Sequence, residues 1–165
     1  MTALALDVVD LLTANNRLLE RLCDAVGLAN VDRDALLADL ENVQRSRHQA
    51  DETVMYPQWL ALGLADAVEA HRVRRAELLD ILAGLRSQTG EREASDPSLV
   101  ERLFDEMLHD LGDLLTRTIE DEEALLVLPL ALHMAVEDRV LLGGAFRQAR
   151  TDGSAVAMAG SVGLL

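Results

Sequence analysis

Apolar residues recur at helical spacing along four long stretches of the chain. These stretches cover residues 4–28, 33–56, 66–85 and 97–128. Each stretch places leucine, valine and alanine on one face of a helix and charged residues on the other. Because the connections are mostly short, neighbouring helices should run in opposite directions. The pattern predicts an all-α fold, an antiparallel four-helix bundle.

Polar residues and prolines mark the predicted ends of these helices. Asp32 is placed to cap the second helix, and Ser95 or Asp96 is placed to cap the fourth. Pro57 should end or kink the second helix, because proline lacks the backbone N–H that a helix needs. Pro129 should interrupt the fourth helix in the same way.

The length and composition suit a single helical domain followed by a tail. Half of the 165 residues are hydrophobic but only 2% are aromatic, so leucine, alanine and valine must fill the core. We assign residues 1–150 to the bundle, including a short additional helix at about 130–150. We assign residues 151–165 to a flexible C-terminal tail, which contains glycine and is weakly patterned. The extra helix and the tail could mediate a homodimer.

The charge of the chain limits its partners. The formal net charge is -14, which argues against binding to nucleic acid or to an anionic membrane. It is compatible with a small-molecule partner. The single cysteine, Cys23, excludes an intrachain disulfide, and the N-terminus does not read as a signal peptide. With no apolar run of about 20 residues, a cytoplasmic protein is expected.

Polar residues interrupt the apolar face of every helix near its middle. At about 100° per residue, Asn16, Arg47, His71 and Glu122 each fall in line with apolar residues, and Asp51 lies one turn beyond Arg47. In a bundle these side chains should be buried and should converge. Burying such groups unpaired costs several kcal/mol each. They must therefore either pair with one another or serve a function.

Four segments of the chain resemble the hemerythrin-like (HHE cation-binding) family. They are LLTANNRLLERL, RHQADETVMYP, AHRVRRAELLDIL and TRTIEDEEALLVLP, within residues 7–132. An internal echo, DETVMYP and EEALLVLP, is consistent with a bundle of two related halves. The resemblance implies a bundle of hemerythrin type, whose helices supply histidine and carboxylate ligands to a non-haem di-iron centre.

The ligand positions that the resemblance implies are only partly kept. Asn16 stands where the first histidine is expected. On the second helix the implied pair is either Arg47 and Asp51 or, one residue later, His48 and Glu52. His71 matches the third position.

On the fourth helix, Thr118 or Ile119 replaces the histidine, and Glu122 or Glu123 keeps the carboxylate. Guanidinium does not bind metal, so Arg47 at a ligand position argues against a metal. We therefore expect no cofactor, with non-haem iron as the alternative.

Three functions remain open. In the first, the middle of the bundle binds a small molecule or performs acid–base chemistry without metal. His71 would then transfer a proton, Arg47 would hold an anionic group, and Asp51 or Glu122 would fix the histidine tautomer. The other ligand-binding candidates are Asn16, Thr118 and Glu123.

In the second possible function, the protein binds one iron, manganese or zinc ion. The ligands would be His71, His48, Glu52 and Glu123, with Asp51 as an alternative ligand on the second helix. In the third, the protein is a non-catalytic scaffold with a structural polar core.

Overall fold

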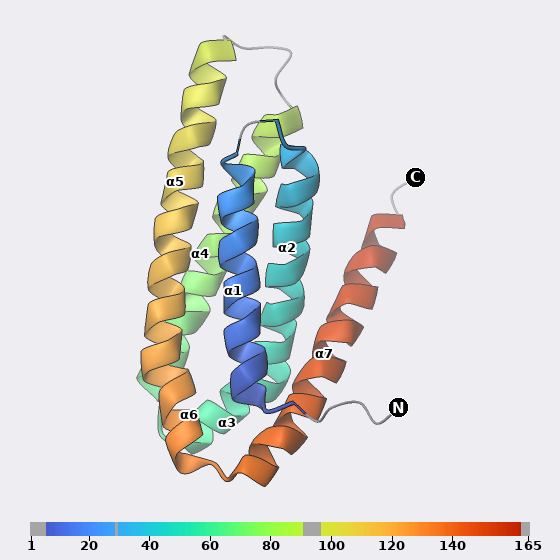
Figure 1. Cartoon of the computed structure of the whole chain (residues 1–165). Coiled ribbons are helices and arrows are strands. Elements are labelled where there is room, and N and C mark those ends of the chain that lie inside the picture. Colours follow the sequence, from blue (N-terminus) through green and yellow to red (C-terminus); the bar gives the residue numbers. More distant parts are fainter. Residues whose placement is uncertain (1–5, 29, 91–96, 163–165) are drawn as a thin grey trace.

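The computed structural model describes residues 6–28, 30–90 and 97–162, and these ranges are helical with no strand. The four longest helices of the bundle are α1 (Val8–Val26), α2 (Arg33–Ala50), α4 (Ala65–Gly90) and α5 (Pro97–Glu122). They lie side by side, and successive helices run in opposite directions (Figure 1). The predicted all-α fold is confirmed.

These four helices form a closed ring of contacts. α1 contacts α2 and α5, and α4 contacts the same two helices from the other side. A fifth long helix, α7 (Val136–Val162), lies outside this ring against α1 and α2 (Figure 1). It extends into residues 151–165, the segment that the sequence analysis separates as a tail.

The two prolines do not end their helices. α2 continues through a π-helical turn, η1 (Asp51–Met55), into α3 (Tyr56–Ala61), and α5 continues through η2 (Glu123–Val127) into α6 (Leu128–His133). A π turn is wider than an α turn and accommodates the proline that follows it. The predicted interruption at Pro129 is therefore wrong. The break comes at Met134, whose backbone is extended, so the last helix begins at Val136.

The start of α2 is capped as predicted. The Asp32 carboxylate accepts a hydrogen bond of 3.0 Å from the N–H of Ala35. Just ahead of it, Asn30 adopts a left-handed conformation with φ of 60°, which suits the tight turn between α1 and α2. The predicted caps Ser95 and Asp96 lie outside the described residues.

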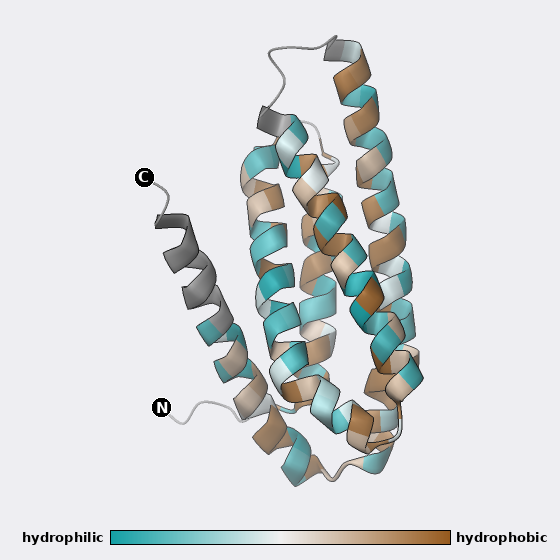
Figure 2. Ribbon diagram, turned by 180° about the vertical axis from the view of Figure 1, so that it is seen from behind, coloured by the Kyte–Doolittle hydropathy of each residue, from teal (hydrophilic) through white to brown (hydrophobic). Residues whose placement is uncertain are grey.

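Two apolar cores lie at opposite ends of the ring of helices. The first apolar core comprises Leu19, Cys23, Val26, Leu37, Leu40, Leu78, Leu82, Leu85, Phe104, Leu111, Leu115 and Ile119. The second apolar core comprises Val8, Leu12, Ala50, Met55, Tyr56, Trp59, Val68, Leu126, Val127, Leu130 and Phe146. In the coloured parts of Figure 2, bands of hydrophobic and hydrophilic residues follow one another along the helices. Within the described ranges, no helix is long and apolar enough to cross a membrane.

Candidate functional site

A layer of polar side chains separates the two apolar cores. On α1, for example, Asn15 and Asn16 lie between Leu12 of the second core and Leu19 of the first. The same order occurs on the other three helices of the ring. We call this set the polar layer: Asn15, Asn16, Gln44, Arg47, Asp51, Tyr56, His71, Arg75 and Glu122.

The residues that the sequence places inward do converge here. Asn16, Arg47 and Asp51 have no exposed surface, while Glu122 is 1% and His71 is 3% exposed. They are joined by direct hydrogen bonds and ion pairs across four helices and η1. The prediction that these side chains are buried together is confirmed, whereas their proposed catalytic roles remain predictions.

Glu122 is the centre of the polar layer. Its Oε1 accepts hydrogen bonds from Arg47 at 2.7 Å and Asn16 at 3.2 Å. Its Oε2 lies 2.8 Å from a guanidinium nitrogen of Arg75 and 2.7 Å from Nε2 of His71. Both carboxylate oxygens are therefore fully engaged by groups from three other helices.

Arg47 connects the second helix to the rest of the layer. Its Nε donates to Oδ1 of Asp51 at 2.8 Å, one turn later on the same chain path. Another of its nitrogens donates to the side-chain oxygen of Asn15 at 3.0 Å. The ring of Phe146 from α7 lies 5.4 Å from the guanidinium carbon and covers this side of the layer.

Arg75 is a second buried arginine that the sequence analysis missed. It is 1% exposed, and it donates to Gln44 at 2.6 Å as well as to Glu122. The signal was available, because Arg75 lies one turn after His71 on the line that continues through Leu78 and Leu82. The layer therefore contains two guanidinium groups against two carboxylates, so their charges balance.

His71 links Glu122 to an aromatic pair. Its Nδ1 lies 3.0 Å from the hydroxyl of Tyr56, and its ring meets that of Trp59 edge to face. Burial has the largest effect on the pKa of Tyr56 and raises it, and the negative charge of Asp51 raises it further. The phenol therefore keeps its proton. A proton on Nε2 suits both contacts, because Nε2 then donates to Glu122 at 2.7 Å and Nδ1 accepts from the Tyr56 hydroxyl. Nε of Arg75 lies 3.2 Å from the same Nε2.

The charge on Glu122 is strongly favoured in spite of its burial. Burial by itself would raise the pKa of this carboxyl. Arg47, the hydrogen bond with His71, and Arg75 outweigh that effect and hold the pKa of Glu122 well below its usual value. Burial would likewise lower the pKa of Arg47, but Asp51 and Glu122 raise it. Both groups are therefore ionised at neutral pH.

Asn15, Gln44 and Tyr56 also belong to the layer and were not predicted. Asn15 adjoins the predicted Asn16, and Gln44 lies between Leu40 and Arg47 on the inward face of α2. Tyr56 could not be found from an α-helical period. The π turn η1 joins the N–H of Tyr56 to the carbonyl of Asp51, five residues back, and so changes the phase of the helix.

Four candidate residues take no part in the layer's network. His48 and Glu52 are about a third exposed and lie 4.0 Å apart, whereas Arg47 and Asp51 face the interior. Glu123 is on the outer face near Arg17. Thr118 is buried, but its hydroxyl donates to the carbonyl of Leu114 in its own helix at 2.7 Å.

The polar layer contains three side chains of the types that bind metal ions. Asp51, His71 and Glu122 offer ligand atoms within 4.8 Å of one another, and imidazole with carboxylates suits iron, manganese or zinc. However, His71 and Glu122 are already bonded to each other, and Arg47 and Arg75 lie against them. A divalent cation beside two buried guanidinium groups would be strongly repelled. The residues as they lie here do not fit a bound metal.

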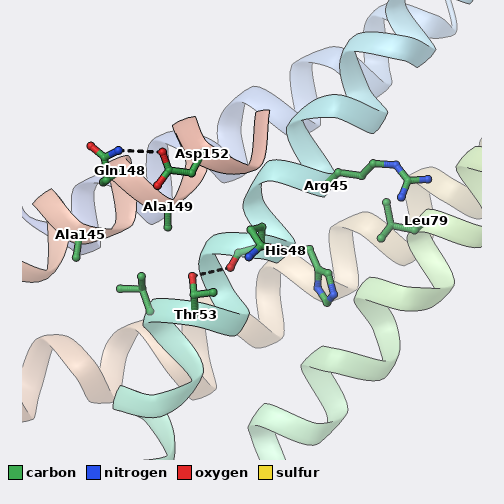
Figure 3. Close-up of a pocket in the computed structure, with 10 residues that line it drawn as sticks. Arg45, His48, Thr53, Leu79, Ala145, Gln148, Ala149 and Asp152 are labelled. Atoms are coloured by element: carbon green, nitrogen blue, oxygen red, sulfur yellow. Dashed lines mark hydrogen bonds between the residues drawn. The ribbon is translucent and has the colours of Figure 1, made fainter. Parts of the chain in front are cut away.

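A groove of about 890 Å³ lies outside the layer, between α2 with η1 and α7. Figure 3 shows Ala145, Gln148 and Ala149 of α7 on one side and Thr53 and His48 on the other. His48, a candidate metal ligand in the alternative register, therefore lines this outer groove and does not face the polar layer.

Comparison of the chain with protein-family models, with curated proteins and with solved structures finds no match.

Proposed function

We propose that the chain is a divergent hemerythrin-like bundle that has no metal centre and acts as a non-catalytic scaffold. Its fold supports this proposal, because four long antiparallel helices carry polar residues at mid-height, at the positions where the hemerythrin-like segments resemble this sequence. The extra helix α7 would be an addition to that architecture.

The observation that carries the proposal is the complete engagement of Glu122. This carboxylate meets Arg47, Asn16, His71 and Arg75 at 2.7 to 3.2 Å. A metal ligand or a catalytic carboxylate needs an oxygen that is free to meet the ion or the substrate. Here both oxygens tie helices together, which is what a structural ion-pair network does.

Metal analysis of the natively purified protein tests this function. We expect less than one tightly bound transition metal per chain. We also expect that a chelator does not change the unfolding temperature, because metal binding would contribute nothing to the folding free energy. Stoichiometric iron that survives dialysis, with the absorption band of a bridged di-iron centre, would show the proposal to be wrong.

A second function, binding of a small polar molecule or acid–base chemistry, is supported by a different observation. Oδ2 of Asp51, Nδ2 of Asn15 and Nε1 of Trp59 are buried and have no hydrogen-bond partner among the described residues. The chain of contacts from Tyr56 through His71 to Glu122 could also carry a proton.

Ligand-observed NMR with small carboxylic acids such as acetate tests this second function. Binding that is lost in Arg47→Leu and His71→Leu, with the helical fold intact, would support it. No binding by the wild type, or equal binding by the variants, would exclude the layer as the site for such ligands.

A further inference from the structure

Glu122 bridges two cations, and each cation has further partners of its own. Oε1 meets Arg47 and Oε2 meets Arg75, at 2.7 and 2.8 Å. Arg47 then pairs with Asp51 at 2.8 Å, and Arg75 with Gln44 at 2.6 Å. A carboxylate that bridges two cations is also the arrangement by which helical bundles hold pairs of metal ions.

We propose that Arg47 and Arg75 are the permanent internal cations of this bundle, and that Asp51, His71 and Glu122 form a latent site for one divalent transition-metal ion. The site opens when the guanidinium groups are removed. This inference rests on the proposed metal-free function, because it treats the arginines as what takes the place of metal in the wild type.

The ligand geometry supports the latent site. The three side chains come from η1, α4 and α5, and their ligand atoms already lie within 4.8 Å of one another. Oδ2 of Asp51 is fully buried and accepts no hydrogen bond from the described residues. One ligand atom is thus already available. Loss of the arginines would leave Glu122 with Asn16 and His71, so a metal ion has to displace the hydrogen bond between Nε2 of His71 and Oε2 of Glu122.

Charge decides which cation the layer holds. With both arginines present the two carboxylates are neutralised, and a divalent ion would add two uncompensated charges in a medium of low dielectric constant. Without them the carboxylates carry two negative charges, of which Arg150 acts on that of Asp51 alone, and a single divalent ion can neutralise them. The same three ligands should therefore reject metal in the wild type and attract it in the variant.

The experiment titrates Co²⁺, chosen for its visible absorption, into the wild type and the Arg47→Ala/Arg75→Ala variant. We expect the variant to bind a single Co²⁺ per chain at least about tenfold more tightly than the wild type. We also expect ligand-field bands, and an unfolding temperature that rises with Co²⁺ concentration in the variant alone. Adding His71→Ala to the double variant should abolish the bands.

The Glu41 carboxylate, whose side chain is 11% exposed, provides the matched control. It also lies between two arginines, Arg45 and Arg86, but no imidazole joins it. Arg45→Ala/Arg86→Ala removes the same number of guanidinium groups from the chain and should gain no tight Co²⁺ binding. Equal Co²⁺ binding by this control and by the buried double variant would overturn the inference.

If the Arg47→Ala/Arg75→Ala variant does not fold without metal, it still tests the latent site. Co²⁺-dependent recovery of the helical circular dichroism spectrum would count as binding. The single Arg75→Ala variant keeps Arg47 with Asp51 and is the milder test, with the same bands expected at weaker affinity. If neither variant prefers Co²⁺ over the control, the latent site is wrong while the proposed function stands. Stoichiometric metal in the wild type would instead overturn both.

Discussion

The first apolar core and the polar layer cross the same four helices, but they hold those helices together by different means. In the first core, leucines from α1, α2, α4 and α5 pack against one another. Such contacts are non-directional, so a neighbour can adjust when one side chain changes. In the polar layer, each bond requires a particular donor and acceptor, and Glu122 alone depends on four partners.

The difference shows what each region contributes. The apolar core supplies most of the favourable free energy of folding, in proportion to buried area. The polar layer adds little net energy, because the desolvation of its charges offsets their attraction. Its contribution is the relative position of the helices, since a shift of one turn would leave Arg47 or Arg75 buried without a carboxylate.

The largest effect should follow the loss of Glu122. Glu122→Leu leaves two buried guanidinium groups without their shared carboxylate, so the loss of unfolding free energy should reach or exceed the upper end of about 3–5 kcal/mol. Leu78→Ala in the first core should cost about 3 kcal/mol. Chemical denaturation of both variants measures the two values. If Glu122→Leu is the milder change, the layer is not the interdependent network described above.

Double mutants distinguish the polar layer from the first apolar core more clearly than single mutants do. Arg47→Leu alone should cost about 3–5 kcal/mol, because it leaves Asp51 charged and unpaired. Arg47→Leu/Asp51→Leu removes the pair together, leaves Glu122 with Arg75, and should recover most of that loss. In the first core, Leu78→Ala/Leu82→Ala should be worse than either single change. A double mutant of Arg47 and Asp51 that is no more stable than Arg47→Leu would contradict this contrast.

The helices could be predicted from the sequence because their apolar residues keep one period over many turns. The capping by Asp32 followed from its residue type and position. The path through Pro57 and Pro129 could not be predicted, because two π turns absorb the prolines and no local residue type signals a π turn. The break at Met134 was missed because neither glycine nor proline marks it.

Much of the polar layer could also be predicted, since Asn16, Arg47, His71 and Glu122 interrupt apolar faces. What the periodicity could not supply was pairing across helices. Arg75 was on the correct face, but its role depends on Gln44 and Glu122, which are distant in the sequence. The resemblance to metal-binding bundles drew attention to histidines and acids, and so away from a second arginine.

Acid should weaken the polar layer before the first core. The pKa of Glu122 is lowered on folding, so its contribution to stability is complete above its unfolded value of 4.5 and is lost as the pH falls below that value. The first core has no group that titrates there. The stability difference between the wild type and Glu122→Gln should therefore shrink below pH 4.5, by up to about 1.4 kcal/mol per pH unit. A constant difference in denaturation experiments across this range would contradict the assignment.

The smallest expected loss of stability follows the removal of one hydroxyl group, and it tests which neighbour fixes the tautomer of His71. Tyr56→Phe removes the hydroxyl that donates to Nδ1 of His71 but keeps the ring against Trp59, so it should cost only about 1 kcal/mol. Because Glu122 still accepts from Nε2, the histidine should keep its proton on that nitrogen. The ¹⁵N shifts of the imidazole measure this, with Leu111→Met in the first core as the control that leaves them unchanged. A proton that moves to Nδ1 in Tyr56→Phe would mean that Tyr56, and not Glu122, fixes the tautomer.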